Sequence, residues 1–339
     1  MMKIIREHKI TEVGEIEFIT LKSEKVCVEL TSYGAAIYQI YFNEHEMLLS
    51  PQDLNTFLKS SAYYGKTVGR VSGRLAVPSY QIDEKSYIVE PVGAPKTNIH
   101  GGKIGFSFKN FEITNEQITS SAVSVTMKYF SKNGEENFPG NLTLFVTYTL
   151  NNQNELRMDY DAQADADTLC NITCHPYFNF QKDKTKINKH MLTVQADHYL
   201  NIDADYLILA KAEVKNTPYD FREQANLGER IAQVLDTPFE GFDHCWVFNH
   251  KANQVDLYNP ESKLGMKVDT NYPSIVMYTH NIPELVQLEQ VSDDAIHSSI
   301  ALECQYEPGG IHHDYLNSAI LRKNEVYKHY ISYQFYRKD

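Results

Sequence analysis

The sequence contains no apolar run that approaches the length of a membrane span, so no transmembrane helix is expected. Its N-terminus is charged from Lys3 onward and lacks the apolar stretch of a secretory signal. There is no dense cluster of lysine and arginine, and the net charge is −12, which argues against nucleic acids and anionic membranes as partners. These absences together predict a cytoplasmic protein with no nucleic-acid and no membrane partner.

Cysteine is also scarce, and its spacing gives no disulfide framework. The five cysteines are Cys27, Cys170, Cys174, Cys245 and Cys304. The run from Cys170 through Cys174 to His175 superficially suggests a metal site. However, no second Cys/His pair stands nearby at zinc-site spacing, and the two sulfurs face opposite His175 along a strand. We therefore predict reduced, mostly buried thiols and no metal.

No stretch of convincing length has a helical period, and no linker or internal repeat interrupts the 339 residues. Instead, many short segments are rich in Val, Ile, Thr, Tyr and Phe, and several alternate between apolar and polar residues. The expected strands are Glu15–Lys22, Val26–Leu30, Ile37–Phe42, Tyr87–Pro91, Ala122–Phe130, Leu142–Leu150, Leu156–Ala162, His190–Ala196, Cys245–Asn249, Lys263–Asp269, Ile275–His280, Ile300–Tyr306 and Val326–Phe335. This succession predicts an all-β sandwich or barrel that forms a single domain over residues 1–339.

The stretch Asn171–Phe180 is typical of a strand that runs into a turn. Residues two apart share a face, so Cys170, Ile172 and Cys174 should pack on a core while His175 points the other way. Pro176 has no N–H to donate and should end the strand, which leaves the imidazole at its rim. That is a suitable place for a catalytic acid or base, although a structural histidine would give the same local pattern.

Four further polar residues stand out from the β background. Arg70 follows Gly69 in a glycine-punctuated segment, and His100 precedes two glycines that could aim its ring into a cleft. Asp243 enters an otherwise apolar strand. Each also has an ordinary structural explanation: a surface arginine, a loop histidine and a turn-capping aspartate.

Glu303 is the most informative of the four because it lies inside the apolar strand Ile300–Tyr306. A carboxylate among Ile, Leu and Cys side chains must either face a cleft or have a partner. Burial would raise its pKa and make it a better base near neutral pH.

Short motifs that occur in order through most of the chain carry a family resemblance. They are Gly69-Arg70-Val71 with Arg74, His100-Gly101-Gly102 with Gly105-Phe106, Gly134–Leu142, Thr173 with His175, Tyr177-Phe178-Asn179, Phe242-Asp243-His244, Tyr278-Thr279 with Asn281, and Leu302-Glu303 with Gln305. With this set the chain resembles the aldose 1-epimerase family, also called galactose mutarotases. The resemblance implies a β-supersandwich of mostly antiparallel strands with very little helix. It also implies cofactor-free interconversion of the α and β anomers of a free aldohexose, galactose or glucose, by ring opening and reclosure.

The resemblance assigns roles to the residues that match. Glu303 resembles the general base that takes the C1 hydroxyl proton, and His175 the general acid that protonates the ring oxygen. His100 belongs with this catalytic group because it resembles a residue that polarises the sugar oxygens. The expected substrate-binding residues are Arg70, Asp243, Tyr177 and Gln305. The expected partner is a small-molecule sugar, with no cofactor or metal, and the protein should be a monomer or homodimer.

The chain also departs from the family pattern around these residues. The departures are Gly73, Cys174, Pro176, His280 and the stretch Pro308-Gly309-Gly310. Three other functions therefore stay open. A glycoside hydrolase could use Asp243 and Glu303 as its carboxylate pair. A hexose-6-phosphate epimerase would need more cations, for which Arg74 and Lys103 are the candidates. A non-catalytic sugar-binding protein would not need both His175 and Glu303.

Overall fold

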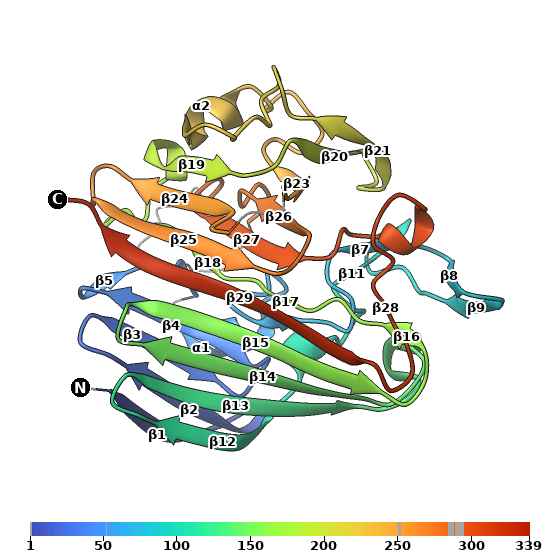
Figure 1. Cartoon of the computed structure of the whole chain (residues 1–339), viewed down its shortest axis with the longest axis horizontal. Coiled ribbons are helices and arrows are strands. Elements are labelled where there is room, and N and C mark those ends of the chain that lie inside the picture. The colour runs from blue at the N-terminus through green and yellow to red at the C-terminus, as the bar shows by residue number, and fades with distance from the viewer. Residues whose placement is uncertain (1, 52, 250–251, 284–287, 289–294) are drawn as a thin grey trace.

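Antiparallel strands make up most of the computed structural model, which describes residues 2–51, 53–249, 252–283, 288 and 295–339. The largest sheet has nine strands in the order β12-β13-β14-β15-β29-β25-β24-β19-β22. Their bounds are β12 Glu112–Ile118, β13 Ala122–Ser131, β14 Leu142–Asn151, β15 Glu155–Ala164, β29 Val326–Arg337, β25 Leu264–Thr270, β24 Val255–Asn259, β19 Met191–Val194 and β22 Ala225–Asn226. The C-terminal strand β29 lies between β15 and β25 and so joins the two halves of the sheet (Figure 1).

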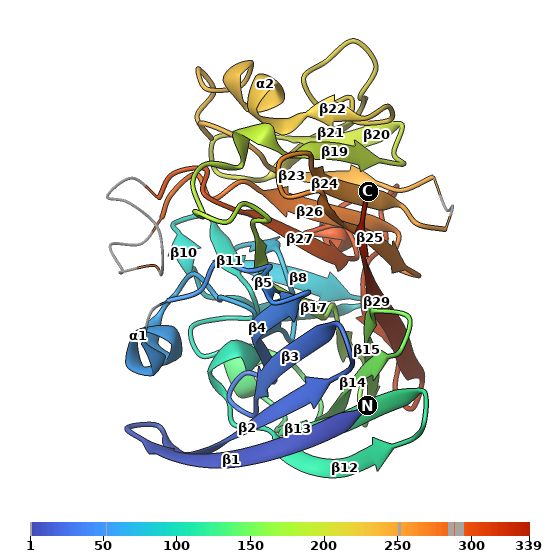
Figure 2. The same ribbon diagram turned by 90° about the vertical axis from the view of Figure 1, so that its left-hand side faces the viewer.

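Two smaller sheets lie behind the large one in Figure 1, one beside each half. The five-stranded sheet follows chain order: β1 Lys3–Thr11, β2 Gly14–Lys22, β3 Val26–Thr31, β4 Ala36–Phe42 and β5 His45–Glu46. The six-stranded sheet has the order β18 Tyr177–Phe178, β27 Ile300–Gln305, β26 Ser274–Tyr278, β23 Asp243–Val247, β20 His198–Ile202 and β21 Ile208–Glu213. Figure 2 shows β1–β4 below the strands of the six-stranded sheet.

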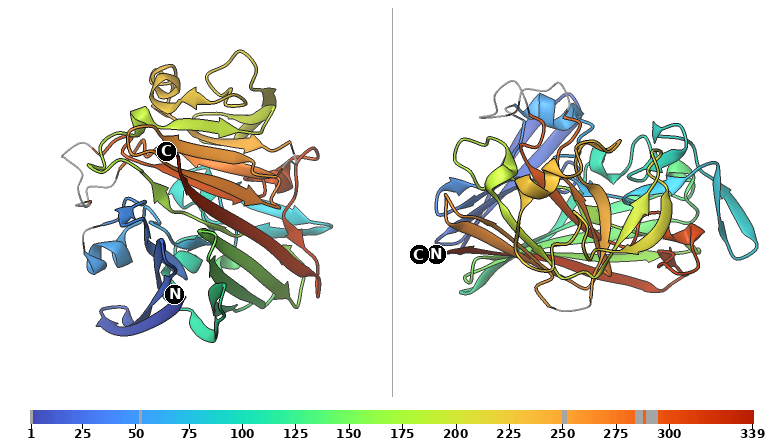
Figure 3. Two further views of the ribbon diagram at one scale, coloured as in Figure 1. Left: turned by 60° about the vertical axis from the view of Figure 1, so that its left-hand side comes forward. Right: turned by 90° about the horizontal axis from the view of Figure 1, so that it is seen from above.

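The remaining elements are short. The small ladders join β10 Gly93–Ala94, β11 Thr97–Ile99 and β7 Arg74–Ala76; β16 Thr168–Leu169 and β28 Ile320–Leu321; β17 Thr173–Cys174 and β6 Thr67–Val68; and β8 Ser79–Ile82 and β9 Lys85–Ile88. The helices are α1 Leu54–Lys59 and α2 Leu227–Ala232, with 3-10 turns at Phe106–Phe108, Glu135–Asn137, Ile187–Lys189 and Gly310–His312. Both α-helices lie at the periphery (Figures 2 and 3). Neither is long enough to cross a membrane, and the described residues contain no other helix that is.

The main core lies between the large sheet and the two smaller ones. In β14 the side chains from Leu142 to Leu150 alternate, with every second one buried, as the sequence pattern predicts. These side chains share one apolar cluster with Val28 and Ile40 of the five-stranded sheet and with Leu302 of the six-stranded sheet. Tyr148 donates its hydroxyl hydrogen across the interface to the backbone oxygen of Ala35 at 2.5 Å. The predicted all-β fold is therefore confirmed, with little helix.

Most predicted strands occur with shifts of a few residues at their ends, but among the longer strands β1, β12, β20, β21 and β24 were not predicted. Strands β1 and β12 are exposed along most of their length, and their sequences are polar, so they lack the apolar alternation that marks a half-buried strand. The Asn171–Phe180 stretch forms two short strands, β17 and β18, on either side of His175-Pro176. Cys170, Ile172 and Cys174 lie in the main core as predicted. The large sheet draws its strands from residues 112–337, so it brings together segments that are far apart in the chain.

Candidate active site

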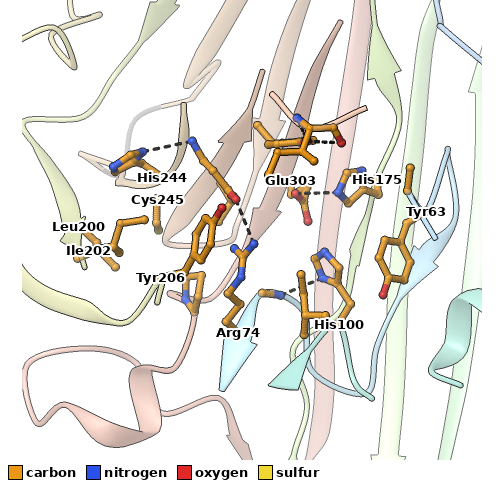
Figure 4. Close-up of a pocket in the computed structure, with 18 of the residues that line it drawn as sticks. Tyr63, Arg74, His100, His175, Leu200, Ile202, Tyr206, His244, Cys245 and Glu303 are labelled. Atoms are coloured by element: carbon orange, nitrogen blue, oxygen red, sulfur yellow. Dashed lines mark hydrogen bonds and ion pairs between the residues drawn. The ribbon is translucent and has the colours of Figure 1, made fainter. Parts of the chain in front are cut away.

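A cavity of about 320 Å³ lies on the face of the six-stranded sheet that points away from the main core. Strands β18, β27, β26, β23 and β20 supply its floor, and Tyr63, His100 and Arg74 of β7 enclose it (Figure 4). Of the predicted site residues, the cavity contains Glu303, His175, His100, Asp243 and Tyr177.

Glu303 reaches the cavity because of strand alternation in β27. Ile300, Leu302 and Cys304 point into the main core, so Glu303 between them points to the opposite face. Its side chain is only 3% exposed, yet Oε2 has no hydrogen-bond partner among the described residues. A buried, under-satisfied carboxyl group at a cavity wall is an unusual arrangement for a purely structural residue.

His175 stands at the break between β17 and β18, where Pro176 interrupts the ladder. Its backbone is fixed on both sides, because its N–H donates to the Lys66 oxygen at 3.1 Å and its oxygen accepts from the Gly65 N–H at 2.9 Å. The Tyr177 ring packs 4.9 Å from the imidazole, centroid to centroid. These contacts hold the ring in one orientation at the cavity wall.

His175 and Glu303 form a direct pair. The Nε2 atom of His175 lies 3.2 Å from Oε1 of Glu303, and both side chains are almost fully buried. The remaining atoms of each group, Nδ1 of His175 and Oε2 of Glu303, have no partner among the described residues. His175 and Glu303 can therefore exchange a proton with each other, while Nδ1 of His175 and Oε2 of Glu303 remain available to a ligand.

His100 joins the pair from the turn after β11. Its Nδ1 accepts a hydrogen bond from the Gly73 N–H at 3.3 Å, so the neutral ring carries its proton on Nε2. The glycine that follows is required here, since a Cβ on Gly101 would lie 2.2 Å from the Gly69 oxygen. His100 is thus held as a hydrogen-bond donor beside His175 and Glu303.

Arg74 and Asp243 form a second polar group in the cavity. Nη2 of Arg74 donates to Oδ2 of Asp243 at 3.1 Å, and the Arg74 guanidinium stacks 3.8 Å over the ring of Tyr206. Both charged side chains are largely buried. An ion pair that borders a cavity in this way offers both donors and acceptors to sugar hydroxyls.

Burial changes the acid–base behaviour of the three central groups. It lowers the pKa of His175 to about 4 and holds the pKa of His100 well below its usual value. Burial raises the pKa of Glu303 well above its usual value, and the negative charge of Asp243 adds to this effect. While the sugar-free pair holds a single proton, that proton therefore resides on Glu303, and His175 is neutral.

Two predicted substrate-binding residues do not line the cavity. Arg70 is 1% exposed, and its guanidinium donates to the oxygens of Pro139 and Gly140 and to Oγ of Ser131. This position suits a role in holding loops together rather than the predicted contact with sugar, because its donors face those groups. Gln305 is fully buried beyond Glu303 on the same face of β27 and lies outside the lining.

A further group of lining residues was not assigned to the site from sequence. It consists of Arg74, Tyr63, Tyr206, Tyr278 and His244. For Arg74 a signal existed, because it lies in the same motif as Arg70 and pairs with Ile99, next to His100. No sequence pattern marks Tyr206, which reaches the cavity from the turn between β20 and β21.

Two departures from the family pattern lie against each other at the cavity wall. A side chain at Gly73, whose φ is +70°, would place its Cβ 2.8 Å from the ring of Pro308. Pro308 therefore fills the space that a larger residue 73 would need, and both residues line the cavity. The two changes are structurally coupled.

The cavity contains enough potential ligands for a metal ion. His100, His175 and Glu303 each place one potential ligand atom within 4.8 Å of the others. The hydrogen bond at His100 argues against a metal at Nε2. Metal binding there requires the proton on Nδ1, which instead accepts from the Gly73 N–H. The donor set thus fits a hydrogen-bonding role better than coordination.

Comparison with known proteins identifies the class. The family model described as aldose 1-epimerase matches residues 17–334, which is nearly the whole chain. The chain belongs to the aldose 1-epimerase family, whose members are isomerases, and the predicted family is confirmed.

Individual relatives are distant, but the similarity covers nearly the full length of each chain. The chain is 28% identical over 335 residues to galactose mutarotase from Homo sapiens, with 95% of this chain and 94% of the relative covered. It is 27% identical over 332 residues to maltose epimerase from Levilactobacillus brevis, with 95% of each chain covered. The crystal structure of galactose 1-epimerase from Lactobacillus acidophilus superimposes with a TM-score of 0.89 at 25% identity, covering 100% of this chain and 99% of that one.

Proposed function

We propose that the protein interconverts the α and β anomers of a free aldohexose, galactose or glucose, without a cofactor. The observation that carries this proposal is the buried His175–Glu303 pair, with 3.2 Å between Nε2 and Oε1, at the wall of a sugar-sized cavity. Opening a cyclic hemiacetal requires one proton to leave the C1 hydroxyl and another to reach the ring oxygen. A pair that holds a single proton can serve both transfers.

In the proposed reaction, Glu303 accepts the proton of the C1 hydroxyl, and His175 protonates the ring oxygen. The open aldehyde rotates about C1–C2 and recloses with the roles reversed. This sequence starts from ionised Glu303 and protonated His175. In the sugar-free pair that protonation state is the less populated one, because burial favours the neutral form of each group. His100 donates Nε2–H to a sugar oxygen, while Arg74 and Asp243 hold the hydroxyls remote from C1.

The rival functions fit this arrangement less well. A glycoside hydrolase would use Asp243 with Glu303, but Asp243 is paired with Arg74 and the partner of Glu303 is an imidazole. A phosphorylated sugar would need additional cations. Among the described lining residues Arg74 is the one lysine or arginine, and its charge is opposed by Asp243, while Lys103 lies on the surface outside the lining.

Polarimetry tests the proposal directly. Freshly dissolved α-D-galactose and α-D-glucose should reach their equilibrium rotation faster with the protein than without it. A rotation curve identical to the uncatalysed one for both sugars would overturn the proposal. Release of sugar from a glycoside would support the hydrolase instead.

Replacing Asp243 by alanine should raise KM by about tenfold or more, because charged hydrogen bonds to the sugar are lost in ground and transition states alike. The effect on kcat should be smaller. Asp205→Ala provides a control, since Asp205 forms an ion pair with Lys96 outside the cavity lining. A collapse of kcat at constant KM would place Asp243 in the chemistry and favour the hydrolase.

Exhaustive chelation should leave the activity unchanged, since the tautomer of His100 opposes metal binding at its Nε2 atom. The polarimetric rate before and after dialysis against a strong chelator measures this. Loss of activity that one added divalent ion restores would contradict it.

A further inference from the structure

The ring of Tyr63 packs against both histidines of the active site. Its centroid lies 4.6 Å from that of His100, in an edge-to-face arrangement, and 6.0 Å from that of His175. The two imidazoles themselves meet edge to face at 5.5 Å. Figure 4 shows the Tyr63 ring beside them, across the site from Arg74 and Tyr206. The three rings therefore form one packed group at the wall of the cavity.

Tyr63 is the outermost ring of this group. His100 is 7% exposed and His175 is 4% exposed, and Tyr177, which packs against His175 from β18, is 2% exposed. Tyr63 is half-buried and lines the cavity. Its ring therefore lies between the two imidazoles and solvent.

The backbone of Tyr63 adopts a conformation that is unfavourable for a bulky residue. Its φ is +59°, in the left-handed region that large side chains rarely adopt. Such strain persists only where the surrounding structure enforces it, and it is concentrated at functional sites. Here the Lys66 N–H donates to the Tyr63 oxygen at 2.9 Å and closes the turn Tyr63–Lys66. The strained backbone points to a functional role for the Tyr63 side chain.

The same turn holds the backbone of His175. The Gly65 N–H donates to the His175 oxygen at 2.9 Å, and the Lys66 oxygen accepts from the His175 N–H at 3.1 Å. The ammonium group of fully buried Lys66 also donates to the oxygen of Ser60, which precedes the turn, at 3.4 Å. Because one turn carries Tyr63 and binds His175, it fixes the two rings relative to each other.

We propose that Tyr63 is a positioning residue that shields His175 and His100 from water and holds their rings towards Glu303. This inference rests on the proposed function and assigns a part in it to a residue that transfers no proton. Electrostatic interactions are stronger where water is excluded. The buried His175–Glu303 pair, with 3.2 Å between Nε2 and Oε1, therefore depends on this shield.

Loss of the Tyr63 ring should narrow the pH range of activity from both sides. Burial is the main cause of the lowered pKa of His175 and of the raised pKa of Glu303. Once water reaches the pair, the first pKa should rise towards about 6.5 and the second should fall towards about 4.3. Because the pair is active while it holds one proton, both pH limits of kcat/KM should move inward. The other titratable groups that face the pair remain in every Tyr63 variant; they are Asp243, Arg74, His100, His280, Tyr177 and Cys174.

The pH profiles of Tyr63 variants test the proposal. Tyr63→Gly removes the ring and suits the positive φ, whereas Tyr63→Phe keeps the ring and is the matched control. Tyr63→Gly should raise the acid limit of kcat/KM by about one pH unit or more and lower the alkaline limit, while Tyr63→Phe keeps both limits. Tyr63→Asn, which also tolerates a positive φ, replaces Tyr63→Gly should that variant not fold. Unchanged limits in Tyr63→Gly, whatever its kcat, would overturn the proposal, and so would equal shifts in Tyr63→Phe.

Histidine NMR separates this inference from the proposed function. In the sugar-free protein, the pKa of His175 measured from its imidazole resonances should be higher in Tyr63→Gly than in the wild type, and unchanged in Tyr63→Phe. His175→Asn identifies the resonances by their loss. A wild type without polarimetric turnover would count against the proposed function. An unchanged pKa of His175 in Tyr63→Gly would overturn the shielding role of Tyr63 independently of turnover.

Discussion

Replacing Glu303 by glutamine should lower kcat for anomer interconversion by about 10²-fold or more, since a positioned proton-transfer group typically contributes 10²–10⁴ in rate. Glutamine has the shape of glutamate but cannot take the proton of the C1 hydroxyl, and it cannot share a proton with His175. The binding contacts of the sugar with Arg74 and Asp243 remain, so KM should change little. Glu307→Gln is a matched control, because Glu307 is also buried but bonds Asn317 instead.

The stability of Glu303→Gln distinguishes lost chemistry from lost folding. In the unfolded chain glutamate ionises at about pH 4.3. In the folded protein the pKa of Glu303 is raised, so the folded state binds more protons than the unfolded state above that pH. The free energy of unfolding therefore falls as pH rises from the unfolded pKa to the folded one. Removing this ionisable group should leave the variant at least as stable as the wild type at pH 7–8 by denaturant unfolding. A clear loss of stability would show that the activity was lost through the fold.

Sequence patterns could predict strands such as β14 and β27, in which apolar side chains recur on the face that packs on the main core. Because this face of β27 carries Ile300, Leu302 and Cys304, the strand directs Glu303 to the cavity on its other face. Strands β1 and β12 form by pairing with a neighbour along the exposed edge of a sheet. Their side chains carry little information about that pairing, so no periodicity marked them.

The two arginines of one motif show what tertiary contact adds. Arg70 and Arg74 lie four residues apart with similar glycine-rich neighbours, and the sequence favoured Arg70 as the sugar contact. In the structure Arg70 donates to the backbone of a distant loop, whereas Arg74 faces Asp243 in the cavity. Only the packing of segments far apart in the chain distinguishes them.

The protonation state of the His175–Glu303 pair could not be predicted from the sequence either. A charged partner raises the pKa of a histidine, and burial lowers it, and the sequence could not show which effect is larger. The structure buries His175 and Glu303 completely enough that burial dominates both. The order of the two pKa values is thereby inverted relative to the free amino acids.

This inversion determines the expected pH profile. The pair should be active while it holds one proton, whichever of its two groups carries it. Activity should therefore be lost below about pH 4, because His175 becomes protonated there and the pair then holds two protons. It should also be lost above the raised pKa of Glu303, where the pair loses its last proton. The kcat/KM of the wild type should form a bell between these limits. A profile that stayed flat from about pH 3 to pH 10, a span that covers both unperturbed values, would exclude the two-residue mechanism.

His175→Asn should lower kcat by about 10²-fold and remove one limb of the bell. The remaining activity depends on ionised Glu303 alone, so it should rise with pH through the raised pKa of that group and then stay constant. Glu303→Gln should show the opposite: residual activity that depends on protonated His175 and falls as pH rises through about 4. Initial polarimetric rates of both variants across the pH range measure the two limbs separately. Two variants that kept the full wild-type bell would show that the limbs belong to other groups, of which buried His100 would be the first to test.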